Sequence, residues 1–236
     1  MKKVFFILIA IIFTASCNDS NSSNFSVSGT VDGIKVGKIF LQRLQDSTLV
    51  NVDSVVFDGE SEFKLKASLS QPEIMYLHLD VKDGTEFNDR LMFFAEDTTM
   101  TMNSTWNNFV NDAVFTGSKN QKLYDTYLKN SKRLNAVYTD LVKKSMSLTD
   151  QTRTKEVTDS IYTAYEKYLR RKVLHAINYA QLYNDKEVAP YLLVSEASEA
   201  NPILLDSVYR SMPKKIQTTV YGKQLSELIN NAKDNL

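Results

Sequence analysis

Few side chains in this sequence could carry out covalent or metal chemistry, and those few stand far apart. Cys17 is the only cysteine, and His78 and His175 are the only histidines. A thiol–disulfide enzyme uses two cysteines, usually in Cys-x-x-Cys, and a zinc site uses three or four neighbouring ligands. The sequence therefore predicts neither thiol redox chemistry nor a bound metal, and we expect both histidines to be structural.

Carboxylates are the next candidates for chemistry. Asp53, Asp58, Glu60 and Glu62 lie close together in the sequence and could supply the acid and the base of a glycosidase. Asp58 stands directly before a glycine, a pair typical of a tight hairpin turn. Glu60 and Glu62 would share the solvated face of a strand whose other face is apolar. We expect these carboxylates to be structural, and a glycan-acting hydrolase stays as an alternative.

The single tryptophan, Trp106, lies in the polar stretch Asn-Ser-Thr-Trp-Asn-Asn-Phe. An exposed aromatic ring can stack on a sugar or on a partner protein, so Trp106 is a candidate contact residue. The alternative is that its ring closes one end of the surrounding β domain.

The surroundings of Cys17 indicate modification rather than catalysis. Two lysines follow Met1, Val4–Phe13 carries no polar side chain, and Thr14–Ser16 places small residues before the cysteine. The apolar run is shorter than the roughly 20 residues of a transmembrane helix. This order is typical of a secretory signal peptide, and it resembles the lipobox of bacterial lipoproteins, although Thr14 stands where Leu is commoner.

The resemblance implies that residues 1–16 are removed as a signal peptide and that Cys17 carries acyl chains that hold the protein on a membrane. Two or more chains anchor a protein stably where one chain does not. Residues 17–24 continue in Asn, Asp and Ser and are expected to form a tether. We therefore expect a lipid-anchored protein of the cell envelope, at the outer membrane, facing either the periplasm or the cell surface.

The overall charge is balanced, with 28 basic and 28 acidic residues. Nucleic-acid-binding domains usually concentrate Lys and Arg, so no nucleic-acid partner is expected. The sequence also has no Gly-x-Ser-x-Gly motif and no glycine-rich phosphate loop, and we expect no cofactor.

Two segments with different patterns follow the tether. Residues 25–117 alternate polar and apolar side chains in short runs divided by turn residues, which predicts seven to nine strands in an antiparallel β-sandwich or open barrel. Hairpins are expected at Asp58-Gly59 and between the runs RLMFFAE and TMTMNS. One strand should place Met75, Leu77, Leu79 and Val81 on one face.

Residues 118–236 are expected to form a helical bundle. Ser118 and Gln121 have the spacing of a capping box, in which each side chain bonds the other residue's backbone amide. Helical periodicity then continues without Gly or Pro to Ala189, with a break near Ser147–Thr152 that divides two long helices. Asn201-Pro202 predicts a further helix start. The fold class is therefore α+β, with a β domain followed by a helical domain.

Several runs of the β half resemble the domain-of-unknown-function family 4369. They include NVDSVVFDGESEFKLKA, QPEIMYLHL and FTGSKNQKLYDTYL, and the resemblance covers about residues 25–130. That family forms the N-terminal domain of many Bacteroidetes-type lipoproteins whose C-terminal domain is thioredoxin-like. Because this sequence has no Cys-x-x-Cys, the redox activity of those relatives is not expected here.

The sequence thus favours a non-enzymatic, lipid-anchored binding or scaffold module with an unknown envelope protein or glycan as its partner. It could be accessory to a separate thioredoxin-like lipoprotein. Two alternatives remain open. One is the hydrolase named above, and the other is a protein that binds a small molecule or lipid in an apolar pocket between the two halves.

Overall fold

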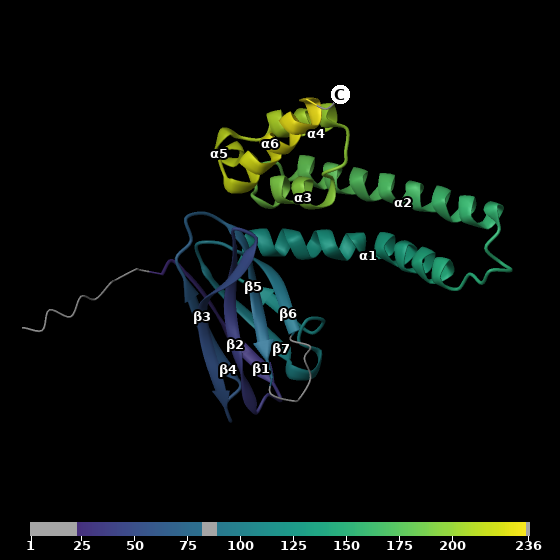
Figure 1. Cartoon of the computed structure of the whole chain (residues 1–236). Coiled ribbons are helices and arrows are strands. Elements are labelled where there is room, and N and C mark those ends of the chain that lie inside the picture. The colour runs from purple at the N-terminus through teal and green to yellow at the C-terminus, as the bar shows by residue number, and fades with distance from the viewer. Residues whose placement is uncertain (1–22, 82–88, 235–236) are drawn as a thin grey trace, which may run out of the picture.

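The structure is a computed structural model that describes residues 23–81 and 89–234. Cys17, the expected signal peptide and most of the expected tether lie outside the described residues. Strands come first along the chain and helices follow, with one short 3-10 helix among the strands (Figure 1). The strands are β1 (Phe25–Asp32), β2 (Val36–Gln45), β3 (Thr48–Asp58), β4 (Glu62–Ala67), β5 (Glu73–Asp80), β6 (Asp89–Ala95), β7 (Thr99–Thr105) and β8 (Val114–Thr116). The helices are η1 (Trp106–Asn108), α1 (Lys119–Met146), α2 (Lys155–Leu182), α3 (Val188–Glu196), α4 (Pro202–Ser211), α5 (Lys214–Gln217) and α6 (Val220–Asp234).

The strands form two four-stranded sheets, which confirms the α+β class. One sheet has the order β4-β1-β7-β8 and the other has the order β3-β2-β5-β6. Most neighbours are antiparallel, but β1 and β7 are parallel, from Ser26 opposite Thr99 to Asp32 opposite Thr105. The expectation of a purely antiparallel domain was wrong at this pair, because side-chain alternation is the same in both strand directions.

Two of the expected hairpins are crossovers between the sheets. The chain passes Asp58-Gly59 from β3 in one sheet to β4 in the other, and it passes from β6 to β7 in the same way. The tight hairpin turn lies instead between β2 and β3, where Asp46 and Ser47 have φ of 46° and 68°. Short polar side chains tolerate this left-handed backbone, so Asp-Ser can replace the more common Asn-Gly.

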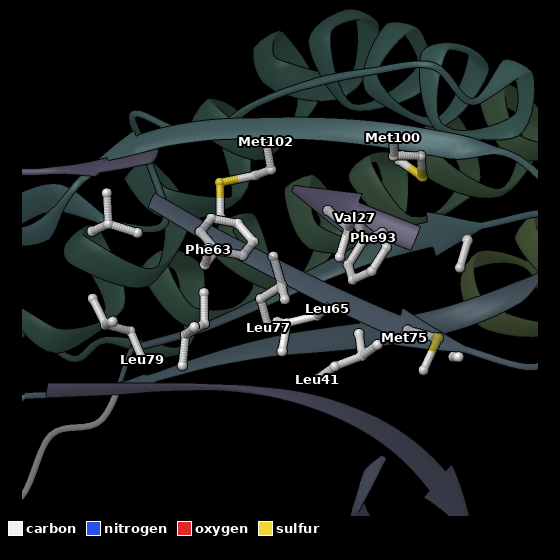
Figure 2. Packing of buried hydrophobic residues seen from close by; sticks show 14 of the residues in the cluster. Val27, Leu41, Phe63, Leu65, Met75, Leu77, Leu79, Phe93, Met100 and Met102 are labelled. Atoms are coloured by element: carbon white, nitrogen blue, oxygen red, sulfur yellow. The ribbon is translucent and has the colours of Figure 1, made fainter. Parts of the chain in front are cut away.

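The first hydrophobic core lies between the two sheets (Figure 2). Met75, Leu77 and Leu79 of β5 point into it, as the alternation predicts, and Val81 packs partly against it. Met100 and Met102 of β7 fill the opposite side, with no exposed surface. This core holds the sandwich together without any help from a disulfide.

A second core joins the sheet to the helices. It contains Ile74 of β5 and Phe94 of β6, whose neighbours along each strand face the first core. The helices contribute a larger apolar set: Tyr124, Tyr127, Ala176, Ile177, Tyr179, Ala180, Val188, Ala189, Leu192, Leu193, Leu205, Val208, Ile216, Leu225 and Ile229. Because Ile74 and Phe94 are buried among these side chains, the helical part is packed on this end of β5 and β6.

The two long helices follow the prediction closely. α1 ends at Met146 and α2 begins after Thr154, so the break lies where the periodicity fails. Together they form a hairpin that projects from the body of the molecule (Figure 1). Within the described residues, no helix is both long and apolar enough to span a bilayer.

Gly117 joins β8 to α1 and leads to the first testable prediction. Its φ is +102°, and an added Cβ would collide with the carbonyl oxygen of Thr99. Gly117→Ala is therefore expected to lower the free energy of unfolding by about 2 to 4 kcal/mol, from backbone strain and steric overlap together. Urea unfolding measures the loss.

Gly59→Ala is the matched control, because Gly59 has φ of +87° with no atom within 4 Å of the added Cβ. Strain alone should cost about 1 to 2 kcal/mol there. Equal losses in the two variants would contradict the close approach of Thr99 to Gly117.

Candidate functional site

A pocket of about 630 Å³ lies where the sandwich meets the helices. Its size falls in the range of small-molecule sites. Charged and polar side chains dominate its wall, whereas the third hypothesis from the sequence required an apolar pocket. The lining residues are Asn24, Leu69, Ser70, Gln71, Pro72, Glu96, Asp97, Thr98, Gly117, Lys119, Asn120, Asp185, Lys186, Glu187, Lys215 and Thr219. We name this feature the junction pocket.

The start of α1 positions one side of the junction pocket. The Ser118 hydroxyl accepts a hydrogen bond from the backbone N–H of Gln121 at 2.9 Å, which confirms half of the predicted capping box. Gln121 does not return the bond. Its Oε1 accepts from the Phe94 backbone N–H at 2.6 Å, and its Nε2 donates to Asp125 at 2.7 Å. The Phe94 N–H on the free edge of β6 thereby gains a hydrogen-bond acceptor, and this bond fixes α1 to the sheet.

Asn120 forms the floor of the junction pocket and is only 2% exposed. Its Nδ2 donates to Glu96 at 2.9 Å and to Glu187 at 3.1 Å, while its Oδ1 accepts from the Val188 backbone N–H at 3.1 Å. Glu96 also accepts from the backbone N–H of Lys119. One amide side chain therefore connects the β6–β7 loop, α1 and the start of α3.

Lysines supply the positive side of the junction pocket. Lys186 donates to Asp185 at 2.7 Å, and this bond raises the pKa of Lys186 and lowers that of Asp185. Lys119 and Lys215 form no ion pair with any carboxylate in the described part of the chain. Their ammonium groups are therefore available to an anionic group of a ligand.

Two half-buried tyrosines pack against the second core. The Tyr221 hydroxyl accepts from the Ile74 backbone N–H at 2.8 Å, and burial raises the pKa of Tyr221 far above its usual value. The Tyr191 and Tyr221 rings meet Phe94 edge-on, at centroid distances of 5.6 and 6.0 Å. These phenols stay neutral and serve as hydrogen-bonding and packing groups.

Trp106 lies away from the junction pocket. It follows the end of β7, whereas the pocket contacts Thr98 at the other end of that strand. An added Cβ on Gly33 would lie 2.7 Å from the Trp106 ring, so the ring covers the turn after β1. The side chain is still 40% exposed, which leaves its outer face open to a contact.

The carboxylates of the cluster around β3 make local backbone contacts or face solvent. Asp53 uses both oxygens locally, accepting from the backbone N–H of Ser54 and of Lys66, each at 2.8 Å. It thereby connects β3 to β4 across the open side of the sandwich. Asp58 and Glu62 are exposed at strand ends.

The histidines stand apart and each stacks on an aromatic ring. His78 lies 5.6 Å from Phe40, and His175 lies 4.9 Å from Tyr127. Burial lowers the pKa of His78, with Arg90 adding to the effect. In the described ranges no group of three or more His, Cys, Asp or Glu side chains is placed to hold a metal ion.

Sequence reasoning missed the residues that build the junction pocket. Asn120, Glu96 and Glu187 belong to no recognisable sequence motif. Glu96 and Glu187 are 91 positions apart in the sequence, and only the fold brings both of them to Asn120. The one signal was the Ser118–Gln121 spacing, which marked the helix start but not its contact with the sheet.

Residues 25–124 match the family model described as Domain of unknown function (DUF4369). This confirms the expected family over the β domain and the first turns of α1. No curated protein and no solved structure matches the chain significantly. The match ends within the helix that carries Asn120 and Gln121, so the matched segment includes the side chains that fix the helix on the sheet.

The Asn120 network gives the second prediction. Asn120→Ala leaves the buried Val188 N–H without its acceptor and removes the donor between Glu96 and Glu187. Because each unpartnered buried group costs about 1 to 3 kcal/mol, we expect the free energy of unfolding to fall by roughly 3 kcal/mol. Chemical denaturation followed by circular dichroism measures it.

Asn108→Ala provides the comparison, since the Asn108 amide also donates to a carboxylate, that of Asp112, but on the surface. Its cost should stay near 0.5 kcal/mol. A similar small cost for Asn120→Ala would contradict the importance assigned to the buried network.

Proposed function

We propose that the protein is a lipid-anchored, non-enzymatic binding module of the cell envelope and that the junction pocket is its ligand site. The observation that carries this proposal is the pocket itself, with an ordered polar floor at Asn120 and the ammonium groups of Lys119 and Lys215, which pair with no carboxylate among the described residues. A preformed recess with a few fixed polar groups is the usual form of a small-molecule site.

The charges around the junction pocket favour a ligand that carries both signs. Lys119 and Lys215 offer donors to a carboxylate, while Asp97 and Glu187 offer acceptors to an ammonium group. A free amino acid or the end of a short peptide has this pattern. A fatty acyl chain does not, because it carries no group that could pair with both the lysines and the carboxylates.

The anchor is supported by the lipobox-like residues before Cys17. Asn24 is bound to Leu69 by two hydrogen bonds, of 2.9 and 2.8 Å, and it lines the junction pocket. An anchor at Cys17 would hold Asn24, which lines the pocket, within about 25 Å of the membrane, since the seven residues from Asn18 to Asn24 span at most roughly that length when extended. The protein would then bind its ligand close to the lipid surface. It would transfer the ligand to another envelope protein, such as a thioredoxin-like lipoprotein, or signal its presence to that protein.

A hydrolase has weaker support. Glu96 and Glu187 are the only carboxylates of the described residues that share a donor in the junction pocket, through Asn120. Both oxygens of Glu96 already accept from N–H groups at the start of α1. A carboxylate whose two oxygens are both engaged in this way has a structural role and is not placed to act on a substrate.

The third prediction tests the junction pocket. Isothermal titration against amino acids, short peptides and neutral sugars should show binding for the amphoteric compounds. Lys215→Ala should weaken that binding at least about tenfold, because one charge-assisted hydrogen bond is lost.

Lys214→Ala is the control, since Lys214 precedes Lys215 in α5 but does not line the junction pocket. It should leave the affinity within about twofold. Binding of fatty acids alone, or steady turnover of a glycan substrate, would refute the proposal.

The fourth prediction tests the anchor. Cys17→Ser should move the protein from the membrane fraction to the soluble fraction, because serine cannot receive the thioether-linked chains. Ser20→Ala should leave the protein with the membrane. Intact mass spectrometry of the wild-type protein should show acyl chains, and an unmodified thiol there would contradict the anchor.

A further inference from the structure

Charge is distributed unevenly along this electrically balanced chain. Residues 25–117 contain 14 acidic and 7 basic side chains, whereas residues 119–182, which form the projecting hairpin, contain 6 acidic and 13 basic ones. The helical hairpin is therefore a positive arm on a negative body. Such a separation favours association with an anionic partner at the arm.

The positive charge of α1 gathers on one face. At 100° per residue, six basic side chains of α1 fall within about 70° of the side opposite Tyr127 and Tyr138, whose rings contact α2. All six are exposed, and within the described residues they form no ion pair. We name them the basic stripe: Lys122, Lys129, Lys132, Arg133, Lys143 and Lys144. It is about 33 Å long at 1.5 Å per residue.

The inner end of the basic stripe enters a recess beside the last strand of a sheet. A cavity of about 500 Å³ there is lined by Phe115 and Thr116 from β8 and, from α1, by Lys122 and Lys129 together with Asp125, whose carboxylate accepts from Gln121. Among the described strands β8 pairs with β7 alone and ends its sheet, and Val114 on it is 62% exposed. An unpaired edge strand is a template for the main chain of another polypeptide.

We propose that this corner between β8 and the basic stripe receives an extended, acidic segment of a partner protein. The edge of β8 supplies backbone hydrogen bonds, and the basic stripe supplies charge complementarity. About ten extended residues would cover the length of the stripe. The site adjoins the junction pocket at Gly117 but uses different charged side chains, so its binding does not depend on the ligand of that pocket.

The shape and charge of the corner separate this partner from two others. A flat membrane surface cannot enter a recess bounded by a strand and a helix, although it could touch the outer half of the arm. A second copy could not place its own arm there, because two basic stripes repel each other. An extended acidic segment fits the shape of the recess and complements the positive charge of the basic stripe.

The fifth prediction uses a fluorescent peptide of alternating Glu and Thr as the probe, with the full chain in solution. Binding is followed by fluorescence anisotropy and should weaken as salt is added. The triple variant Lys129→Glu, Lys132→Glu, Arg133→Glu should lower the affinity at least tenfold. Hydrogen exchange at Val114–Thr116 should slow when the peptide binds.

The control reverses three basic residues with the same spacing on α2: Lys167→Glu, Arg170→Glu and Arg171→Glu. Both triple variants change the net charge equally, so the control should keep the affinity within about threefold if the corner is the site. Equal losses in the two variants would overturn the proposal in favour of nonspecific attraction. Tighter binding to equimolar phosphatidylglycerol–phosphatidylcholine vesicles than to the peptide would also overturn the proposal. A dimer of the protein that the α1 triple variant dissociates would overturn it as well. Unchanged small-ligand binding in the α1 variant separates this test from that of the junction pocket.

Discussion

Two buried amide side chains at the start of α1 determine how the helical part sits on the sandwich. Gln121 binds the free N–H of Phe94 on the sheet edge, and Asn120 joins Glu96 to Glu187. Both amides are almost fully buried, so losing a partner would leave a polar group in an apolar surrounding. Few orientations of α1 satisfy all these bonds, and the junction pocket exists because this orientation is fixed.

The sequence predicted the elements well and their long-range partners poorly. Alternation placed Met75, Leu77 and Leu79 correctly, because burial of one strand face is a local property. The same alternation could not reveal that Asp58-Gly59 is a crossover, since a turn residue fits both arrangements. Nor could it reveal that Gln121 would leave its capping box, because the competing partner is a backbone N–H that comes near only in the folded state.

The balanced composition concealed a further property. Summed over the chain, the charges cancel, but the fold assigns the acidic excess to the sandwich and the basic excess to the projecting arm. The described N-terminal end and the tip of the arm lie on opposite sides of the molecule (Figure 1). In the proposed lipid-anchored protein, the junction pocket would therefore stay near the membrane while the arm reaches away toward a partner.

The claim that the amide network makes one unit of sandwich and helices has a direct test in equilibrium unfolding followed by two probes. Trp106 is the only tryptophan and belongs to the sandwich, so its fluorescence reports that part, while far-ultraviolet circular dichroism reports mainly the helices. We expect the two urea transitions to coincide, as in a two-state protein. Different urea midpoints for the two signals, with the helical signal lost before the tryptophan fluorescence changes, would contradict the claim that sandwich and helices form one unit.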